Sequence, residues 1–315
     1  MSNLVVENYN LNNYTGYVDP DMVDNPLDQS PLYFKVHREQ LVGDTHINRV
    51  GMPFQYRTPL YGLFRDNGSF LGAHTEKYSV MENETLFRHV QGYIVDAIQD
   101  TKPELLENVT VNDKASYNGA ISMREFIFNN ILYENETNNG HKTSNALRLI
   151  ILNSFDVKTP VKVYGGNIDF FCLNGMILGS FDAFSKRHTK NMQVGNLTAP
   201  IEQMFLNYFK FTNDMFKQSQ KYLDAERGRA FIEKCFEGMD RKTSNMLNQY
   251  DEEIKTRGHN VWALTSALTS YGSGNSSFFS SKNTENDHQH FTTLKRQGSV
   301  QNILNSTEYR ELVAA

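Results

Sequence analysis

The stretch LRLIILNSFDVKTPVKVYGGNIDFFCLNGMILGSFDAFSKRHTKNM, residues 147–192, decides the expected fold. Gly165-Gly166 and Asn174-Gly175 interrupt its apolar runs, because both pairs favour turns. Three strands are predicted at 146–152, 161–164 and 168–173, and a fourth apolar stretch follows at 176–181. Strands separated by such short turns are typical of an antiparallel meander, not of a βαβ unit.

Toward the N-terminus, two further β-units flank a predicted helix. Residues 57–65 lead into Asp66-Asn67-Gly68, where Asn-Gly tolerates positive φ and therefore predicts a hairpin. Apolar residues recur at helical spacing over 84–100, which predicts a helix. Two strands and a long polar loop are then predicted at 108–113, 119–133 and 134–144, respectively.

Beyond residue 192 the apolar pattern changes to a period of 3.6, which predicts helices. A first helix begins at Thr198, and a break at Arg227-Gly228 precedes a second. Gly258 is expected to end a third helix. The later helices are predicted at about 228–239, 242–257, 261–271 and, at the C-terminus, 297–312.

These patterns predict the α+β class, with a curved antiparallel sheet packed against helices and a helical C-terminal half. Residues 1–45 show little periodicity and are rich in Asn, Asp and Pro, so they predict an extended arm. The core is expected at 46–271, β-rich over 55–192 and helical over 198–271. A flexible Ser/Asn-rich loop at 272–290 and a helix or tail at 291–315 complete the expected organisation.

Bulk composition limits the expected compartment and partners. The 315 residues carry a net charge of −5, which disfavours a broadly basic nucleic-acid binder but leaves room for a local basic surface. Cys172 and Cys235 each adjoin a phenylalanine, which predicts buried, reduced thiols. We find neither a signal peptide nor an apolar run of the ~20 residues needed to span a bilayer. The sequence therefore predicts a cytoplasmic protein without a membrane partner.

No catalytic or cofactor motif withstands inspection. Gly165-Gly166 lacks the spacing of a phosphate-binding loop, and no helix is expected to open after it. The nine histidines have no partners at zinc-ligand spacing, and Cys172 lies in an apolar run. Three carboxylates around the meander could pair as acid and base or hold Mg²⁺, namely Asp156, Asp169 and Asp182. Asp156 is better explained by an Asx-type turn, so we predict no catalytic residue, no metal and no cofactor.

The strongest candidate for binding is the basic cluster Lys186-Arg187-His188-Thr189-Lys190-Asn191, directly after the meander. Its fixed charges can bind phosphate oxygens, and Tyr164, Phe170 and Phe171 are nearby rings on which unpaired bases could stack. The alternative is a solvated loop beside core aromatics. A second basic patch, formed by Lys255, Arg257 and His259, precedes Trp262, the single tryptophan.

Several segments together resemble the phage and plasmid family known as "domain of unknown function 932". The segments, in order, are LFRDNGSFLGAHTEKYSVMENETLF (63–87), GAISMREFIF (119–128), LRLIILNSFD (147–156), FFCLNGM (170–176), RHTKN (187–191) and NVWALTSALTSYGS (260–273). The resemblance covers about residues 55–310. The chain departs from the pattern at Val157, where the family has Gly, and at Ser266, where it has Asn. The resemblance implies a mobile-element or phage origin but no activity.

From the basic cluster, the adjoining aromatics and this resemblance, we expect a non-enzymatic, phage-encoded protein that binds single-stranded DNA. It would support recombination or replication as a homo-oligomer. The residues expected to bind nucleic acid are Lys186, Arg187, Lys190, Tyr164, Lys255, Arg257 and Trp262. The alternative is a protein-binding factor, such as an inhibitor of host defence or a virion or assembly component. A third hypothesis is a metal-dependent nuclease.

Overall fold

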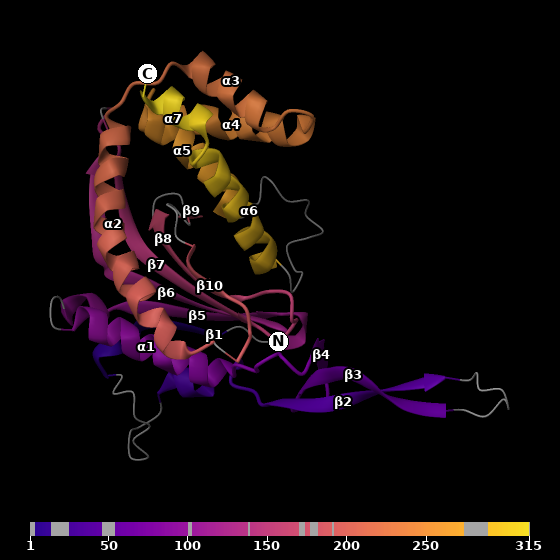
Figure 1. Cartoon of the computed structure of the whole chain (residues 1–315). Coiled ribbons are helices and arrows are strands. Elements are labelled where there is room, and N and C mark those ends of the chain that lie inside the picture. Colours follow the sequence, from indigo (N-terminus) through magenta and orange to yellow (C-terminus); the bar gives the residue numbers. More distant parts are fainter. Residues whose placement is uncertain are drawn as a thin grey trace.

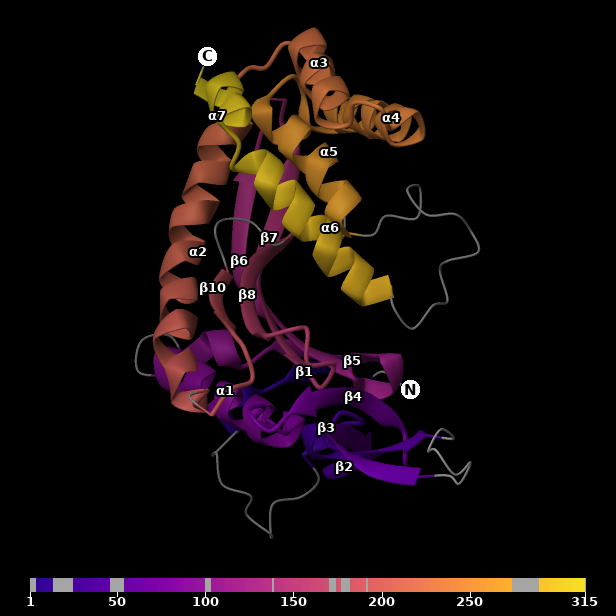
Figure 2. The same cartoon turned by 45° about the vertical axis from the view of Figure 1, so that its right-hand side comes forward.

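The computed structural model describes residues 4–13, 25–45, 54–99, 103–137, 139–169, 174–176, 182–190, 192–273 and 289–314. They form two antiparallel sheets followed by a mainly helical C-terminal half (Figures 1 and 2). The predicted α+β class is therefore confirmed.

The larger sheet is the predicted meander, extended by strands at both edges. Its strand order is β1-β5-β6-β7-β8-β10, and β9 pairs with β8. Each of these pairings is antiparallel. The strands are β1 (Leu4–Tyr9), β5 (Val109–Ser116), β6 (Ile121–Glu136), β7 (Lys142–Ser154), β8 (Val161–Asp169), β9 (Asn174–Met176) and β10 (Asp182–Lys186).

Two local predictions about this sheet are wrong. The polar stretch 134–144 is a tight hairpin rather than a long loop, because β6 and β7 continue into it and Gly140 adopts a φ of 81° at the turn. Gly165 does not break β8, which runs on to Asp169. A Cβ at Gly165 would lie 3.1 Å from Cγ of Met204, so the glycine permits close packing on the helix that carries Met204.

The smaller sheet is a ribbon of three strands. It comprises β2 (Val36–Thr45), β3 (Phe54–Arg65) and β4 (Phe70–Thr75), in that order. Gly68 has a φ of 82°, which confirms the hairpin predicted at Asn67-Gly68. Figure 1 shows β2 and β3 extending away from the larger sheet.

Helices cover both faces of the larger sheet. Figures 1 and 2 show α2 along the convex side of the curved sheet and α6 on its concave side. The helices are α1 (Asn83–Ile98), α2 (Thr198–Ser219), α3 (Ala225–Cys235), α4 (Asp240–Arg257), α5 (Val261–Ser273), α6 (Gln289–Leu304) and α7 (Thr307–Ala314). Among the described residues, no helix has both the length and the apolar character that a membrane crossing requires.

The helical half differs from prediction at two points. Gly228 lies inside α3 instead of marking a break, and a Cβ there would lie 2.2 Å from the Tyr250 hydroxyl of α4. The glycine therefore serves close packing between helices. The single C-terminal helix predicted at 297–312 is divided into α6 and α7, because the Ser306 hydroxyl accepts a hydrogen bond from the Tyr309 backbone N–H and starts a new helix.

The described parts of the expected N-terminal arm are built into the body. β1 pairs with β5 in the larger sheet. Buried apolar side chains follow at Leu11, Leu27, Leu32 and Phe34. Of the loop expected at 272–290, residues 274–288 lie outside the described residues.

A buried ion pair joins these elements. Arg124 on β6 and Asp113 on β5 are both 0% exposed, and the Arg124 Nε and Nη2 atoms lie 2.7 and 2.6 Å from the two Asp113 carboxylate oxygens. Arg124 Nη1 also donates to the Tyr33 hydroxyl at 2.7 Å and to Gln91 Oε1 of α1 at 2.8 Å. The Ser30 hydroxyl donates to Asp113 at 2.5 Å. One charge pair thus connects two strands, a helix and the segment before β2.

The next residue along β6, Glu125, points to the opposite face of the sheet. It pairs with Arg148 of β7 and accepts a hydrogen bond from Asn112 at 2.9 Å. Both faces of β6 therefore carry a paired charge.

We predict that Arg124→Met lowers the free energy of unfolding by about 3–5 kcal/mol, because it leaves the Asp113 carboxylate buried without its partner. Urea denaturation measures this loss. The exposed Lys142–Glu136 pair is the comparison, and Lys142→Ala should change stability little. A small loss in Arg124→Met would contradict the role given to this pair.

Candidate nucleic-acid interface

The basic loop, residues 186–190, leaves the edge of the larger sheet and lies against the connection between β4 and α1. Tyr78 and Thr189 form an isolated antiparallel bridge. The Ser79 backbone N–H donates to the His188 carbonyl at 3.2 Å. Within the loop, the Thr189 N–H donates to the Arg187 carbonyl at 2.8 Å. The loop backbone is therefore fixed at several points.

Cations from three separate segments gather around this loop. Lys77 precedes Tyr78, the bridge partner of Thr189. Lys158 lies in the turn before Val161, the residue that pairs with Lys186 at the end of β10. No ion pair with a described residue occupies any of the five cations, which are Lys77, Lys158, Lys186, Arg187 and Lys190. Lys186 is half-buried and the other four are exposed.

One acidic side chain that acts on this loop, Asp156, is already engaged in a turn. Asp156 Oδ1 accepts hydrogen bonds from the backbone N–H groups of Lys158 at 3.0 Å and Thr159 at 2.7 Å, and Oδ2 accepts one from the Thr159 hydroxyl at 2.7 Å. The predicted Asx-type turn is therefore confirmed. Glu76, next to Lys77 in the chain, is exposed. The cations outnumber the neighbouring carboxylates, so this surface attracts anions.

Tyr164 lies on β8, opposite Ile150 and Asp182, and is half-buried. It alternates with Val161 and Val163, which face the core, and so it points to the other face of the sheet. The Lys162 ammonium sits over its ring, 5.4 Å from the centroid. Tyr164 remains a candidate for stacking, with a cation beside it. Phe170 and Phe171 lie outside the described residues.

The second predicted patch does not join the first. Arg257 is fully buried, donates from Nε to Glu253 at 2.7 Å, and lies 5.6 Å from the ring centroid of Trp262, which is 1% exposed. Burial keeps that guanidinium from a phosphate and that ring from a base, so both residues are removed from the candidate site. Lys255 is exposed on α4 and pairs with Glu252 at 2.6 Å. Figures 1 and 2 place α4 at the opposite end of the molecule from β4.

Sequence reasoning missed a row of neighbouring rings behind the basic loop, which we call the aromatic ladder: Tyr61, His74, Tyr78 and His188. The ring centroids of neighbours lie 5.9, 4.8 and 5.1 Å apart in that order. The Arg38 guanidinium covers the outer face of Tyr61 at 4.0 Å. Only long-range strand pairing brings these rings together, so their spacing in the chain gives no signal.

The two histidines of the ladder are buried. His188 is 5% exposed, and burial lowers its pKa to about 4, an effect that the negative charge of Asp156 partly opposes. Burial also lowers the pKa of His74. An interaction of the His188 ring with the Ser79 backbone also opposes the shift, although neither ring nitrogen makes a hydrogen bond of normal geometry with a described residue. His188 is therefore a neutral ring at the centre of a cationic loop.

Metal and thiol chemistry have no support in the described part of the chain. It contains no group of three or more His, Cys, Asp or Glu side chains placed to hold a metal ion. The side chains of Asp169 and Asp182, and the whole of Cys172, lie outside what the structure describes. Cys235 is a free, half-buried thiol, and burial raises its pKa to about 11. That thiol is a poor nucleophile at neutral pH.

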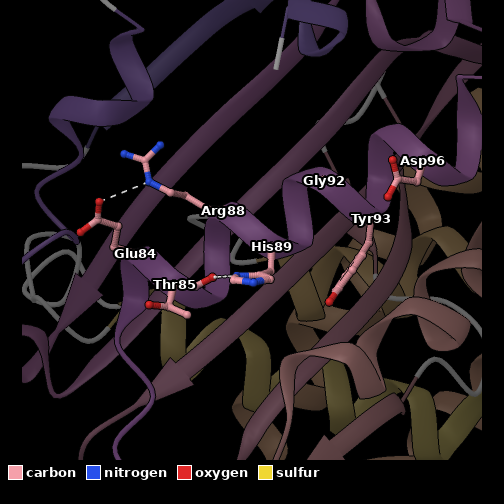
Figure 3. A pocket seen from close by; sticks show the side chains of 7 residues that line it. All are labelled: Glu84, Thr85, Arg88, His89, Gly92, Tyr93 and Asp96. Atoms are coloured by element: carbon pink, nitrogen blue, oxygen red, sulfur yellow. Dashed lines mark hydrogen bonds and ion pairs between the residues drawn. The ribbon is translucent and has the colours of Figure 1, made fainter. Parts of the chain in front are cut away.

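A shallow hollow of about 360 Å³ lies along the outer side of α1 (Figure 3). Its lining comes from this one helix: Glu84, Thr85, Arg88, His89, Gly92, Tyr93 and Asp96. Arg88 is paired with Glu84 at 3.3 Å and with Asp28 at 2.7 Å. Because its cation is neutralised and its groups point in different directions in Figure 3, the hollow forms no organised site.

We predict that burial of neutral His188 makes the protein less stable in mild acid. The unfolded chain takes up this proton near pH 6.5 and the folded chain only near pH 4, so stability is lost as the pH falls between these values. The full effect is roughly 3 kcal/mol. Urea unfolding followed by Trp262 fluorescence should show a smaller acid loss in His188→Phe than in the wild type. Equal losses in both proteins would contradict this account.

Comparisons with known proteins return no relative: no protein family, no curated protein and no solved structure matches the chain. The candidate interface therefore depends on the geometry of this chain alone.

Proposed function

We propose that the chain binds single-stranded nucleic acid through the basic loop and the cations beside it. The observation that carries this proposal is the convergence of five cations from three segments, without carboxylate partners among the described residues, in a protein of net charge −5. Charges collected at one place against an acidic background favour a polyanion that spans several cations at once. Each cation would neutralise one backbone phosphate.

Two features favour single strands. The cations lie at the edge of a sheet, around a short loop, where an extended strand can pass with its phosphates toward them. Tyr164, on a neighbouring strand, offers a ring for a base that is not held in a duplex, and Lys162 adds a positive charge there. The wider role, support of recombination or replication by a phage-encoded homo-oligomer, is part of the proposal and draws on the sequence resemblance.

Protein binding is the second candidate function, and the ribbon of β2–β4 favours it. Phe70 is 54% exposed, and its ring meets that of Phe64 at 5.5 Å between centroids. Leu60 is exposed on the same strand as Phe64. Exposed aromatic residues on a projecting ribbon are typical of a surface that contacts another protein. The third hypothesis, a nuclease, predicts cleavage of DNA with Mg²⁺ or Mn²⁺, and uncleaved DNA would exclude it.

We predict that the chain binds a single-stranded oligonucleotide with strong dependence on salt, measured by fluorescence anisotropy at several salt concentrations. Each phosphate contact contributes about −0.7 to the slope of log K against log salt. The triple variant Lys186→Ala, Arg187→Ala and Lys190→Ala should bind more weakly and with a slope smaller by about 2.

The matched control removes three cations elsewhere, as Lys142→Ala, Lys217→Ala and Lys255→Ala. These lysines are exposed and each is already paired with a carboxylate. The control has the same net charge as the loop variant and should keep nearly the wild-type slope. If the wild type shows no salt-sensitive binding below ~10⁻⁴ M, or if both triple variants weaken equally, the proposal is wrong.

A further inference from the structure

We infer that the aromatic ladder holds the basic loop in its binding position, and that His188 and Tyr78 are positioning residues for the bound strand. The consequence for binding rests on the proposed function, whereas the hold on the loop does not. Within the loop, His188 is the buried residue, while Arg187 and Lys190 on either side of it are exposed and Lys186 is half-buried.

The ladder gives the loop a rigid support. The ring of His188 stacks on Tyr78 with 27° between their planes. Tyr78 is in turn fixed to the sheet, because its hydroxyl donates to the Ser154 carbonyl at 3.0 Å. His74 Nδ1 contacts the Thr75 carbonyl at 2.6 Å, which sets the orientation of the next ring. The support therefore reaches from the loop through the ribbon sheet to Tyr61.

The loop needs such support because its charges repel one another. Lys186, Arg187 and Lys190 lie within five residues, and Lys77 and Lys158 lie beside them. A loop of like charges without an anchor would spread outward, and binding would then have to order it again. A ring held in the core fixes the spacing of the charges before the ligand arrives.

The support depends on His188 being neutral. The charged and titratable groups around its ring are Tyr78 and Lys77 before α1, Asp156 and Lys158 in the turn after β7, His74 of β4, and the loop's own cations. Asp156 is the one carboxylate among these, and its oxygens already serve the turn. A proton on His188 would add a further positive charge to the cluster, and only Asp156 and the Ser79 backbone beside the ring favour that charge. Acid should therefore release the loop.

Trypsin tests the hold on the loop without any ligand, because the loop itself contains three trypsin sites, after Lys186, Arg187 and Lys190. At neutral pH the wild type should be cut slowly there. His188→Ala should be cut several times faster, and His188→Phe, which keeps a ring on Tyr78, should stay close to the wild type. His259→Ala changes a histidine in the helical half and is the control. Trp262 fluorescence verifies that each variant is folded.

Oligonucleotide binding tests the consequence. His188→Ala keeps every cation, so we expect about tenfold weaker binding, equivalent to ~1.4 kcal/mol, with an unchanged salt slope. The triple variant that removes the loop cations should instead reduce the slope of log K against log salt. In the wild type, affinity should fall as the pH approaches 4, although acid usually strengthens binding to a polyanion, and His188→Phe should lack this fall.

The cleavage and binding experiments distinguish failure of the inference from failure of the proposed function. Equal tryptic cleavage in wild type and His188→Ala overturns the inference, as does faster cleavage with unchanged affinity. If the wild type binds no oligonucleotide, the proposed function fails, and the cleavage rates alone then decide whether the ladder holds the loop. An acid fall in affinity that His188→Phe shares with the wild type also overturns the inference.

Discussion

The buried pair of Arg124 and Asp113 is the constraint on which the arrangement of the first half depends. Two charges at 0% exposure are tolerated only when their hydrogen bonds are satisfied, and here the partners come from β5, β6, α1 and the segment before β2. A shift of any one of these elements would leave a charge without a partner. The pair thus ties the position of α1 to that of β5 and β6.

Charged side chains occur in two different environments in this protein. In the interior it is paired, as on both faces of β6, where Arg124 and Glu125 each meet an opposite charge. Around residues 186–190 it is left unpaired by any described carboxylate, and the loop packs on the aromatic ladder through His188.

Local patterns predicted the local structure well. The Asn67-Gly68 hairpin, the strands predicted at 108–113, 119–133 and 146–152, helix α1 and the Asx turn at Asp156 all follow from short-range rules. The failures share another cause. Gly165 and Gly228 look like breaks in the chain, but each makes room for a side chain from a different element. Periodicity contains no information on such contacts.

Some parts of the candidate site could likewise be predicted from the sequence, and others could not. The cations at 186–190 were predictable because they are contiguous, whereas Lys77 and Lys158 join them only through the Tyr78–Thr189 bridge and the pairing of β10 with β8. Arg257 and Trp262 were misplaced because a basic residue near an aromatic one has the same pattern on a surface and in a core. The aromatic ladder could not be predicted for the same reason as Lys77 and Lys158, because its residues also come together only through pairing between distant segments.

The pairing of β1 with β5 has a consequence for how the chain folds as it is made. Leu4 pairs with Asp113, so the first described strand has no partner until more than a hundred further residues have been synthesised. At ~5–20 residues per second, that delay is roughly 5–20 s. Ser30 and Tyr33 wait for a somewhat shorter time, because their partners Asp113 and Arg124 follow 83 and 91 residues later. Until β5 has been made, β1 lacks its partner in the sheet, so the addition of β1 to the sheet must follow the synthesis of β5.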